Sequence, residues 1–122
     1  ELNLPLPGTE PNAYIIICTE EPKGKWVDID LGISAQSMLL KAVDLGLNGI
    51  CIAAFNKEKI CALVNGGRQM EPLLILAIGK SIERFQLLPI GQEDEHNYFR
   101  KNGVHFVPKV RIEDLLIWTN QK

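Results

Sequence analysis

Residues 30–55 read DLGISAQSMLLKAVDLGLNGICIAAF, and this stretch decides the fold. Its first part carries apolar residues at alternating spacings of four and three, as on one face of a helix: Leu31, Ala35, Met38, Ala42 and Leu45. Leu39 and Val43 lie beside this row and widen the apolar face. The pattern therefore predicts a helix that packs on more than one side.

The second part of the stretch predicts the end of the helix and the next element. Gly46 comes directly after the last periodic residue, where glycine can take the left-handed conformation that ends a helix. After a turn at residues 47–49, Ile50–Ala54 has the length and apolarity of a strand buried on both faces. Two alanines at its end would let the backbone approach a neighbour closely.

The segments before this stretch predict an arm and a strand. Leu2–Pro11 contains three prolines and a glycine, which favours an extended entry arm over a packed element. Ala13–Thr19 is rich in β-branched residues and predicts a central strand. The helix should then begin near Val27, with Asp28 and Asp30 placing negative charge in its first turn.

The segments after residue 55 predict a mixed succession of elements. Asn56 can cap a short helix over Lys57–Val64, which residues 65–67 would end. A strand over Leu73–Ile78 comes next, and residues 81–98 are expected to be irregular. A short strand at Gly103–Pro108 should precede a final helix from Ile112 with three apolar residues, Leu115, Leu116 and Trp118. Together these elements predict a layered α+β fold.

Three segments resemble the second half of the FMN-dependent nitroreductase family. The first has the pattern Asp-x-Gly-x-x-x-Gln-x-x-Leu-Leu-x-Ala at residues 30–42, followed by Leu-Gly-Leu and a strand ending in small residues. The second, Glu71–Lys80, is similar to the late core strand of the family with its terminal glycine, and the third, Val107–Arg111, is similar to its basic tail. Their order and spacing, over residues 13–116, carry the resemblance.

The resemblance implies a fold, a reaction and a partner. The fold would be a nitroreductase-like sheet flanked by helices, in a single domain over residues 1–122 that is only part of the family domain. Hydride would pass from NADH or NADPH through FMN to a nitroaromatic, quinone or similar acceptor. The helix at residues 31–45 would meet the same helix of a second subunit in a homodimer, although it could instead lie at the centre of a monomer.

One family feature has no counterpart in the sequence. Members begin with a helical region that contains an Arg-Arg-Ser-x-Arg-like motif, which grips the FMN phosphate and ring, and nothing here matches it. The chain also begins at Glu1 without an initiator methionine. Two explanations stay open: an N-terminal half that precedes Glu1, which we favour, or a shortened relative whose flavin site is incomplete.

Composition narrows the classes of partner. The net charge is −2, and positive and negative residues are interspersed along the chain without a basic cluster. Neither nucleic acid nor a membrane surface is therefore expected as a partner. No apolar run approaches the ~20 residues that a spanning helix needs. The three cysteines, Cys18, Cys51 and Cys61, are odd in number and lack metal-ligand spacing, so neither a disulfide framework nor a zinc site is expected. Free cysteines of this kind fit a protein of the reducing cytoplasm.

Lys109 and Arg111 are the first candidate cofactor-binding residues. On an extended backbone, residues two apart point to one face, so the two cations could clamp a phosphate, which a guanidinium can grip bidentately. In most proteins such a pair is simply a solvated edge. The resemblance implies that it helps to bind the FMN phosphate.

Cys51, Ile52, Ala53 and Ala54 are the second candidate. The resemblance implies that the backbone of this strand end lies beside the reactive N5 edge of the flavin, where an N–H donor stabilises developing charge. Relatives often carry an acidic residue or glycine here, whereas this chain has two alanines. The alternative is a plain buried strand.

The remaining motifs favour structural roles. The glycines at residues 66–67 lack phosphate-loop spacing, and His96 and His105 lack partners at metal-ligand spacing. No side-chain acid or base can be proposed as catalytic, and no metal is expected. The sequence thus predicts an FMN-dependent NAD(P)H oxidoreductase of the nitroreductase type; the alternative is a non-catalytic flavin-binding or interaction module that needs another chain to complete its site.

Overall fold

The computed structural model describes residues 8, 10–20, 24–64 and 70–117. They form an α+β fold, as predicted, in two compact units, Glu1–Ser81 and Ile82–Lys122. The single domain over residues 1–122 stays a prediction. Most of the predicted entry arm lies outside the described residues.

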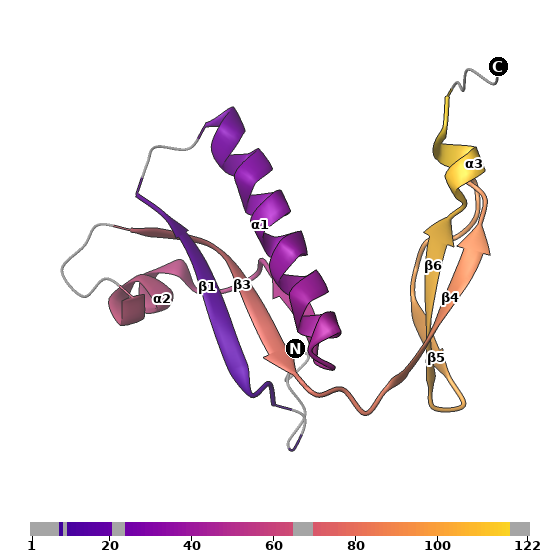
Figure 1. Ribbon diagram of the computed structural model, residues 1–122, viewed down its shortest axis with the longest axis horizontal. Coiled ribbons are helices and arrows are strands. Elements are labelled where there is room, and N and C mark those ends of the chain that lie inside the picture. The colour runs from indigo at the N-terminus through magenta and orange to yellow at the C-terminus, as the bar shows by residue number, and fades with distance from the viewer. Residues whose placement is uncertain (1–7, 9, 21–23, 65–69, 118–122) are drawn as a thin grey trace. The chain divides into compact units, whose positions relative to one another are not determined.

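Unit 1 is a three-stranded antiparallel sheet with a helix across it (Figure 1). Strand β3 (Glu71–Gly79) lies between β1 (Ala13–Thr19) and β2 (Asn48–Ile52). Helix α1 (Lys25–Asp44) contacts both β2 and β3. The prediction that β1 is central was wrong, because β3 is the strand whose apolar residues are buried in sequence, from Ile75 to Ile78.

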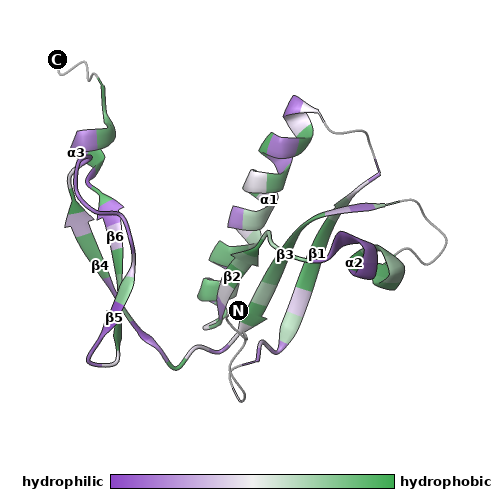
Figure 2. Ribbon diagram, turned by 180° about the vertical axis from the view of Figure 1, so that it is seen from behind, coloured by the Kyte–Doolittle hydropathy of each residue, from purple (hydrophilic) through white to green (hydrophobic). Residues whose placement is uncertain are grey.

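The core of unit 1 forms where α1 meets β3. Ala35 and Ala42, one on each of two helical turns that face the sheet, are buried against Leu76 and Ile78. Met38 and Leu39 complete this face. Figure 2 shows hydrophobic segments along β1 and β3, whereas α1 alternates between hydrophobic and hydrophilic bands.

The helix ends where the sequence indicates. Gly46 has a φ of +73°, and its N–H donates to the Val43 carbonyl at 2.9 Å. The Leu47 N–H donates to the Ala42 carbonyl at 2.9 Å, so the last carbonyls of α1 find partners in the turn. The predicted helix–turn–strand connection is confirmed.

Helix α2 (Lys57–Val64) has the bounds that the sequence predicts. The Asn56 side chain caps it, because its Oδ1 accepts a hydrogen bond from the Lys59 N–H at 2.8 Å. The predicted end of this helix at residues 65–67 lies outside the described residues.

Strand β2 differs from its prediction in place and burial. It runs from Asn48 to Ile52, so Ala53 and Ala54 come after the strand. Ile50 is 64% exposed and Cys51 is also exposed. The predicted burial on both faces is therefore wrong in this chain, because β2 is an edge strand and pairs only with β3.

Unit 2 is a small mixed sheet followed by one helical turn. Central strand β6 (Val104–Val110) pairs in parallel with β4 (Arg84–Ile90) and antiparallel with β5 (Phe99–Lys101). Helix α3 (Ile112–Leu115) comes after β6. These last two elements confirm the predicted strand and helix start, although Trp118 lies outside the described residues.

Strand β4 lies in the region that the sequence predicted to be irregular. That prediction was wrong, because the register of β4 on β6 runs without interruption from the pair Arg84–Val104 to the pair Ile90–Val110. Phe85 and Leu87 alternate with Arg84 and Gln86, a period-two pattern that the surrounding charges and Pro89 obscure.

Candidate functional site

The carboxyl end of β2 presents exposed backbone amides. The last paired residue of β2 is Ile52, opposite Ile75. Ala53 and Ala54 come next and are exposed. Within the described residues, no backbone carbonyl accepts a hydrogen bond from either amide. Two small, exposed residues therefore follow this strand.

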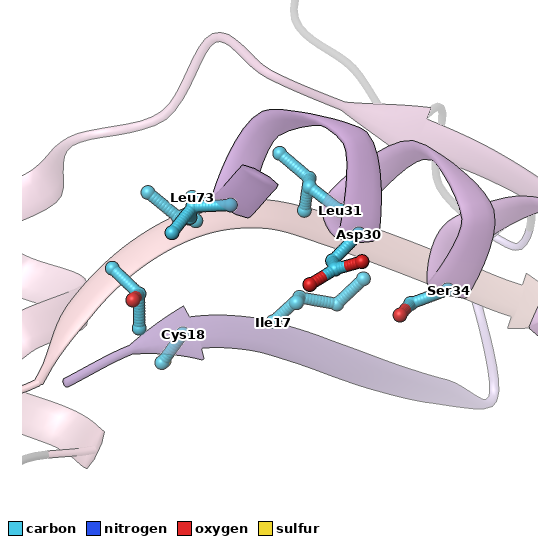
Figure 3. A pocket seen from close by; sticks show the side chains of 8 residues that line it. Ile17, Cys18, Asp30, Leu31, Ser34 and Leu73 are labelled. Carbon is cyan, nitrogen blue, oxygen red and sulfur yellow. The ribbon is translucent and has the colours of Figure 1, made fainter. Parts of the chain in front are cut away.

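A pocket of about 300 Å³ lies at the carboxyl end of β1, the strand at the opposite edge of the sheet from β2 (Figure 3). Asp30 and Ser34 reach into it from α1, opposite Ile17 of β1. The register shift between Ile17 and Cys18 leaves Leu73 without a strand partner, and this side chain lines the pocket. The lining is Ile17, Cys18, Thr19, Val27, Asp30, Leu31, Ser34 and Leu73.

The pocket is separate from the residues that the sequence singles out. None of Cys51, Ile52, Ala53, Ala54, Lys109 or Arg111 lines it. Its one thiol is Cys18, whose pKa is raised by burial and, to a smaller extent, by the neighbouring Cys61. A thiol with a raised pKa is a poor nucleophile.

Lys109 and Arg111 flank the end of β6. Both are exposed, whereas Val110 between them is half-buried and pairs with Ile90. This alternation fits the predicted placement of both cations on one side of an extended backbone. The pair belongs to unit 2, and the β2 end belongs to unit 1.

Arg111 already has an anionic partner. Its Nε donates a hydrogen bond to Asp114 Oδ2 at 2.8 Å, and its Nη2 lies 2.8 Å from the same oxygen in an ion pair. Asp114 is three residues further on, in the turn of α3, and its N–H donates to the Arg111 carbonyl at 3.1 Å. This pair was not predicted from the sequence, although the spacing of three residues is one at which side chains meet on a helical turn.

His105 forms a second polar cluster in unit 2. Its Nδ1 lies 3.3 Å from Glu83 Oε2, and Glu83 Oε1 accepts a hydrogen bond from Arg100 Nε at 2.8 Å. The rings of Phe85 and Tyr98 lie 5.5 Å and 5.3 Å from the imidazole. The hydrogen bond from Arg100 and the weaker contribution of His105 lower the pKa of Glu83.

Helix α1 also carries an exposed apolar stripe, which fits the predicted helix that packs on more than one side, although only Val43 of the stripe was named from the sequence. The stripe consists of Trp26, Ile29, Ile33, Leu40 and Val43, with exposed fractions of 71%, 40%, 61%, 61% and 61%. Successive members recur at spacings of three, four or seven residues, so they share one side of the helix. This side is distinct from the one that Ala35 and Ala42 bury.

The model of the nitroreductase family matches residues 7–80, which is more than half of the chain. The chain belongs to the nitroreductase family. The matched span contains α1, β2 and β3, which carry most of the resemblance, whereas the likeness of the tail at residues 107–111 stays a prediction. A comparison with curated proteins found no match.

Membership of the nitroreductase family indicates oxidoreductase-type chemistry. Two further findings concern the described residues only. None of their helices has the length and apolar character needed to cross a membrane. No group of three or more His, Cys, Asp and Glu side chains among them could hold a metal ion.

Proposed function

We propose that this nitroreductase-family chain is an FMN-dependent NAD(P)H oxidoreductase. The family match over residues 7–80 carries the proposal. Bound FMN would supply the hydride-accepting and hydride-donating centre between NADH or NADPH and a nitroaromatic, quinone or similar acceptor.

The proposed cofactor-binding residues form two groups, one in each unit. Lys109 and Arg111 are cationic groups at the surface, suited to a phosphate. Ala53 and Ala54 offer exposed backbone amides, and small side chains let a flat ring approach them. Cys51 and Ile52 hold the strand that leads to these amides, so the cofactor-binding set is Cys51, Ile52, Ala53, Ala54, Lys109 and Arg111.

We also propose that the active form is a homodimer. The α1 stripe, from Trp26 to Val43, leaves five large apolar side chains exposed on one helix face. An exposed apolar patch on one face of a helix favours association. A second copy of α1 offers the same surface, so one stripe can cover the other around a two-fold axis.

The cell compartment is inferred from the cysteines and the nicotinamide cofactor. Cys18, Cys51 and Cys61 are all free thiols. Free thiols persist in a reducing environment. We therefore propose a cytoplasmic protein.

The alternative function is a flavin-binding or interaction module without turnover. Such a module would need another chain to complete its site.

A reduction experiment separates the two functions. The purified chain is loaded with FMN without oxygen, and NADH or NADPH is added while the visible absorption of the flavin is monitored. An oxidoreductase loses this absorption and regains it when a quinone is added. Retained absorption with bound FMN would favour the module, and no FMN binding by the chain alone would contradict the oxidoreductase.

A further inference from the structure

The guanidinium of Arg111 lies among acidic and polar groups of unit 2. Besides the hydrogen bond and ion pair with Asp114 Oδ2, its Nη2 lies close to Gly91, where an added Cβ would stand 3.4 Å from it. The same Cβ would stand 3.4 Å from Asp94 Oδ2, which also accepts a hydrogen bond from the Gly91 N–H at 2.7 Å.

The chain holds Asp114 in this position from two further directions. The Asp114 N–H donates to the Arg111 carbonyl, which closes the turn between the two residues. The Gln92 side chain donates to the Asp114 carbonyl, which ties the turn to the loop after β4. The carboxylate is therefore fixed beside the cation by its own backbone.

Because of this geometry, the Nε–Nη2 edge of the Arg111 guanidinium already faces a carboxylate. A phosphate that grips this edge bidentately would compete with the carboxylate for it. It would also meet the negative charge of Asp114 at contact distance, and like charges repel. Lys109, by contrast, has no ion pair within the described residues.

We propose that Asp114 is an intrachain competitor for anions at Arg111 and so sets how tightly the chain binds a phosphate-bearing ligand. This inference rests on the proposed function, in which Arg111 receives the FMN phosphate. Asp114 acts through Arg111 and is a positioning residue. A phosphate binds by displacing the Asp114 carboxylate from the guanidinium or by sharing it.

The test compares FMN affinity, measured by flavin fluorescence, in five forms of the full chain. They are the parent, Asp114→Asn, Arg111→Ala, the double variant and the matched control Glu113→Gln. The control removes the same charge one residue away, where Glu113 makes no ion pair within the described residues. Inorganic phosphate, added as a competitor, reports on the phosphate subsite separately.

Competition predicts a specific pattern. Asp114→Asn should bind FMN about fivefold more tightly, which is the size of effect that an exposed ion pair allows. Inorganic phosphate should also compete at a lower concentration in this variant. Glu113→Gln should change affinity much less, and Asp114→Asn should have no effect when Arg111 is already alanine.

The outcomes separate failure of this inference from failure of the proposed function. If Arg111→Ala weakens FMN binding but Asp114→Asn leaves it unchanged or weaker, Asp114 is a structural support and the inference is wrong. If Arg111→Ala has no effect on FMN binding, the assignment of Arg111 to the FMN phosphate is wrong. Equal gains from Asp114→Asn and Glu113→Gln would indicate net charge alone and would also overturn the inference.

Discussion

Leu39 of α1 lies directly over Gly49 of β2. A Cβ added to Gly49 would stand 2.4 Å from Leu39 Cδ2 and 2.7 Å from Ile78 Cδ1. The helix can therefore approach the strand this closely only because residue 49 has no side chain. This contact ties together the helix, the turn and the strand of residues 30–55.

Gly49→Ala should lower the free energy of unfolding by about 1–3 kcal/mol, the range for overpacking a core. Both Leu39 and Ile78 would have to shift to make room. Denaturant unfolding measures the change. Gly32→Ala is the matched control, because Gly32 is a helical residue with open space around it and should gain about 0.5–1 kcal/mol. A Gly49→Ala protein as stable as the parent would contradict the close approach.

Ile33→Asp should convert the homodimer to a monomer. Ile33 lies in the middle of the α1 stripe and is 61% exposed, so the change spares the core of unit 1 and places a charge in the proposed interface. Sedimentation velocity measures the mass of the species in solution. Ala62→Asp on the exposed side of α2 should remain a dimer. The proposal fails if the parent sediments as a monomer or if Ile33→Asp still sediments as a dimer.

Lys109→Ala should weaken FMN binding by about fivefold at low salt, and the difference from the parent should shrink as salt is added. The reason is that an exposed charge acts through Coulomb attraction, whose range falls from about 10 Å at 0.1 M salt to about 3 Å at 1 M. Titration of FMN at several salt concentrations measures this. Lys101→Ala, an exposed cation on β5, is the control. Parent-like affinity in Lys109→Ala would remove Lys109 from the site.

Cys18 should react with iodoacetamide more slowly than Cys51 near neutral pH. Burial and the neighbouring Cys61 raise the pKa of Cys18, so less of it is thiolate, whereas Cys51 is exposed. Mass spectrometry of modified peptides measures both rates. The rate at Cys18 should increase as the pH is raised through its pKa. Equal rates for the two cysteines would contradict the burial of Cys18.

Glu83 should titrate below the ordinary glutamate pKa of about 4.3. Its pKa is lowered by the hydrogen bond from Arg100, so ionised Glu83 stabilises the fold above about pH 4.3, and this stabilisation is lost as the pH falls through the lowered pKa. Carboxyl NMR measures the titration. Arg100→Ala should return the pKa towards its ordinary value, whereas Lys101→Ala should leave it unchanged. An unaltered titration in Arg100→Ala would rule out this hydrogen bond as the cause.

Helix α1 and its connection to β2 could be predicted, because both depend on interactions between residues close in the sequence. The end of α1 depends on Gly46 and the cap of α2 depends on Asn56, and each acts on groups within a few residues of itself. The central place of β3 was not assigned in advance, because strand order depends on pairing between distant segments, such as Ile15 with Leu76.

The wrong predictions also concern contacts between segments that are distant in the sequence. The apolar sequence of β2 predicts burial on both faces, but the same sequence occurs whether or not another element covers the strand. The sequence predicted that α1 packs on more than one side, but most residues of the α1 stripe were not named, because a helix with apolar residues on two sides has no single periodic face. At the candidate site, the residue types Lys109 and Arg111 could be chosen from the sequence, but the carboxylate of Asp114 against Arg111 could not.

We propose that this chain binds FMN, and that Lys109 and Arg111 of unit 2 and the β2 end of unit 1 each contribute to the binding. The most direct test is NMR of the full, isotope-labelled chain during titration with FMN. The account predicts that the amide signals of Ala53 and Ala54 shift, and that the phosphorus signal of bound FMN differs between the parent and Lys109→Ala. Amide shifts confined to other parts of the chain, together with an identical phosphorus signal in the two proteins, would contradict it.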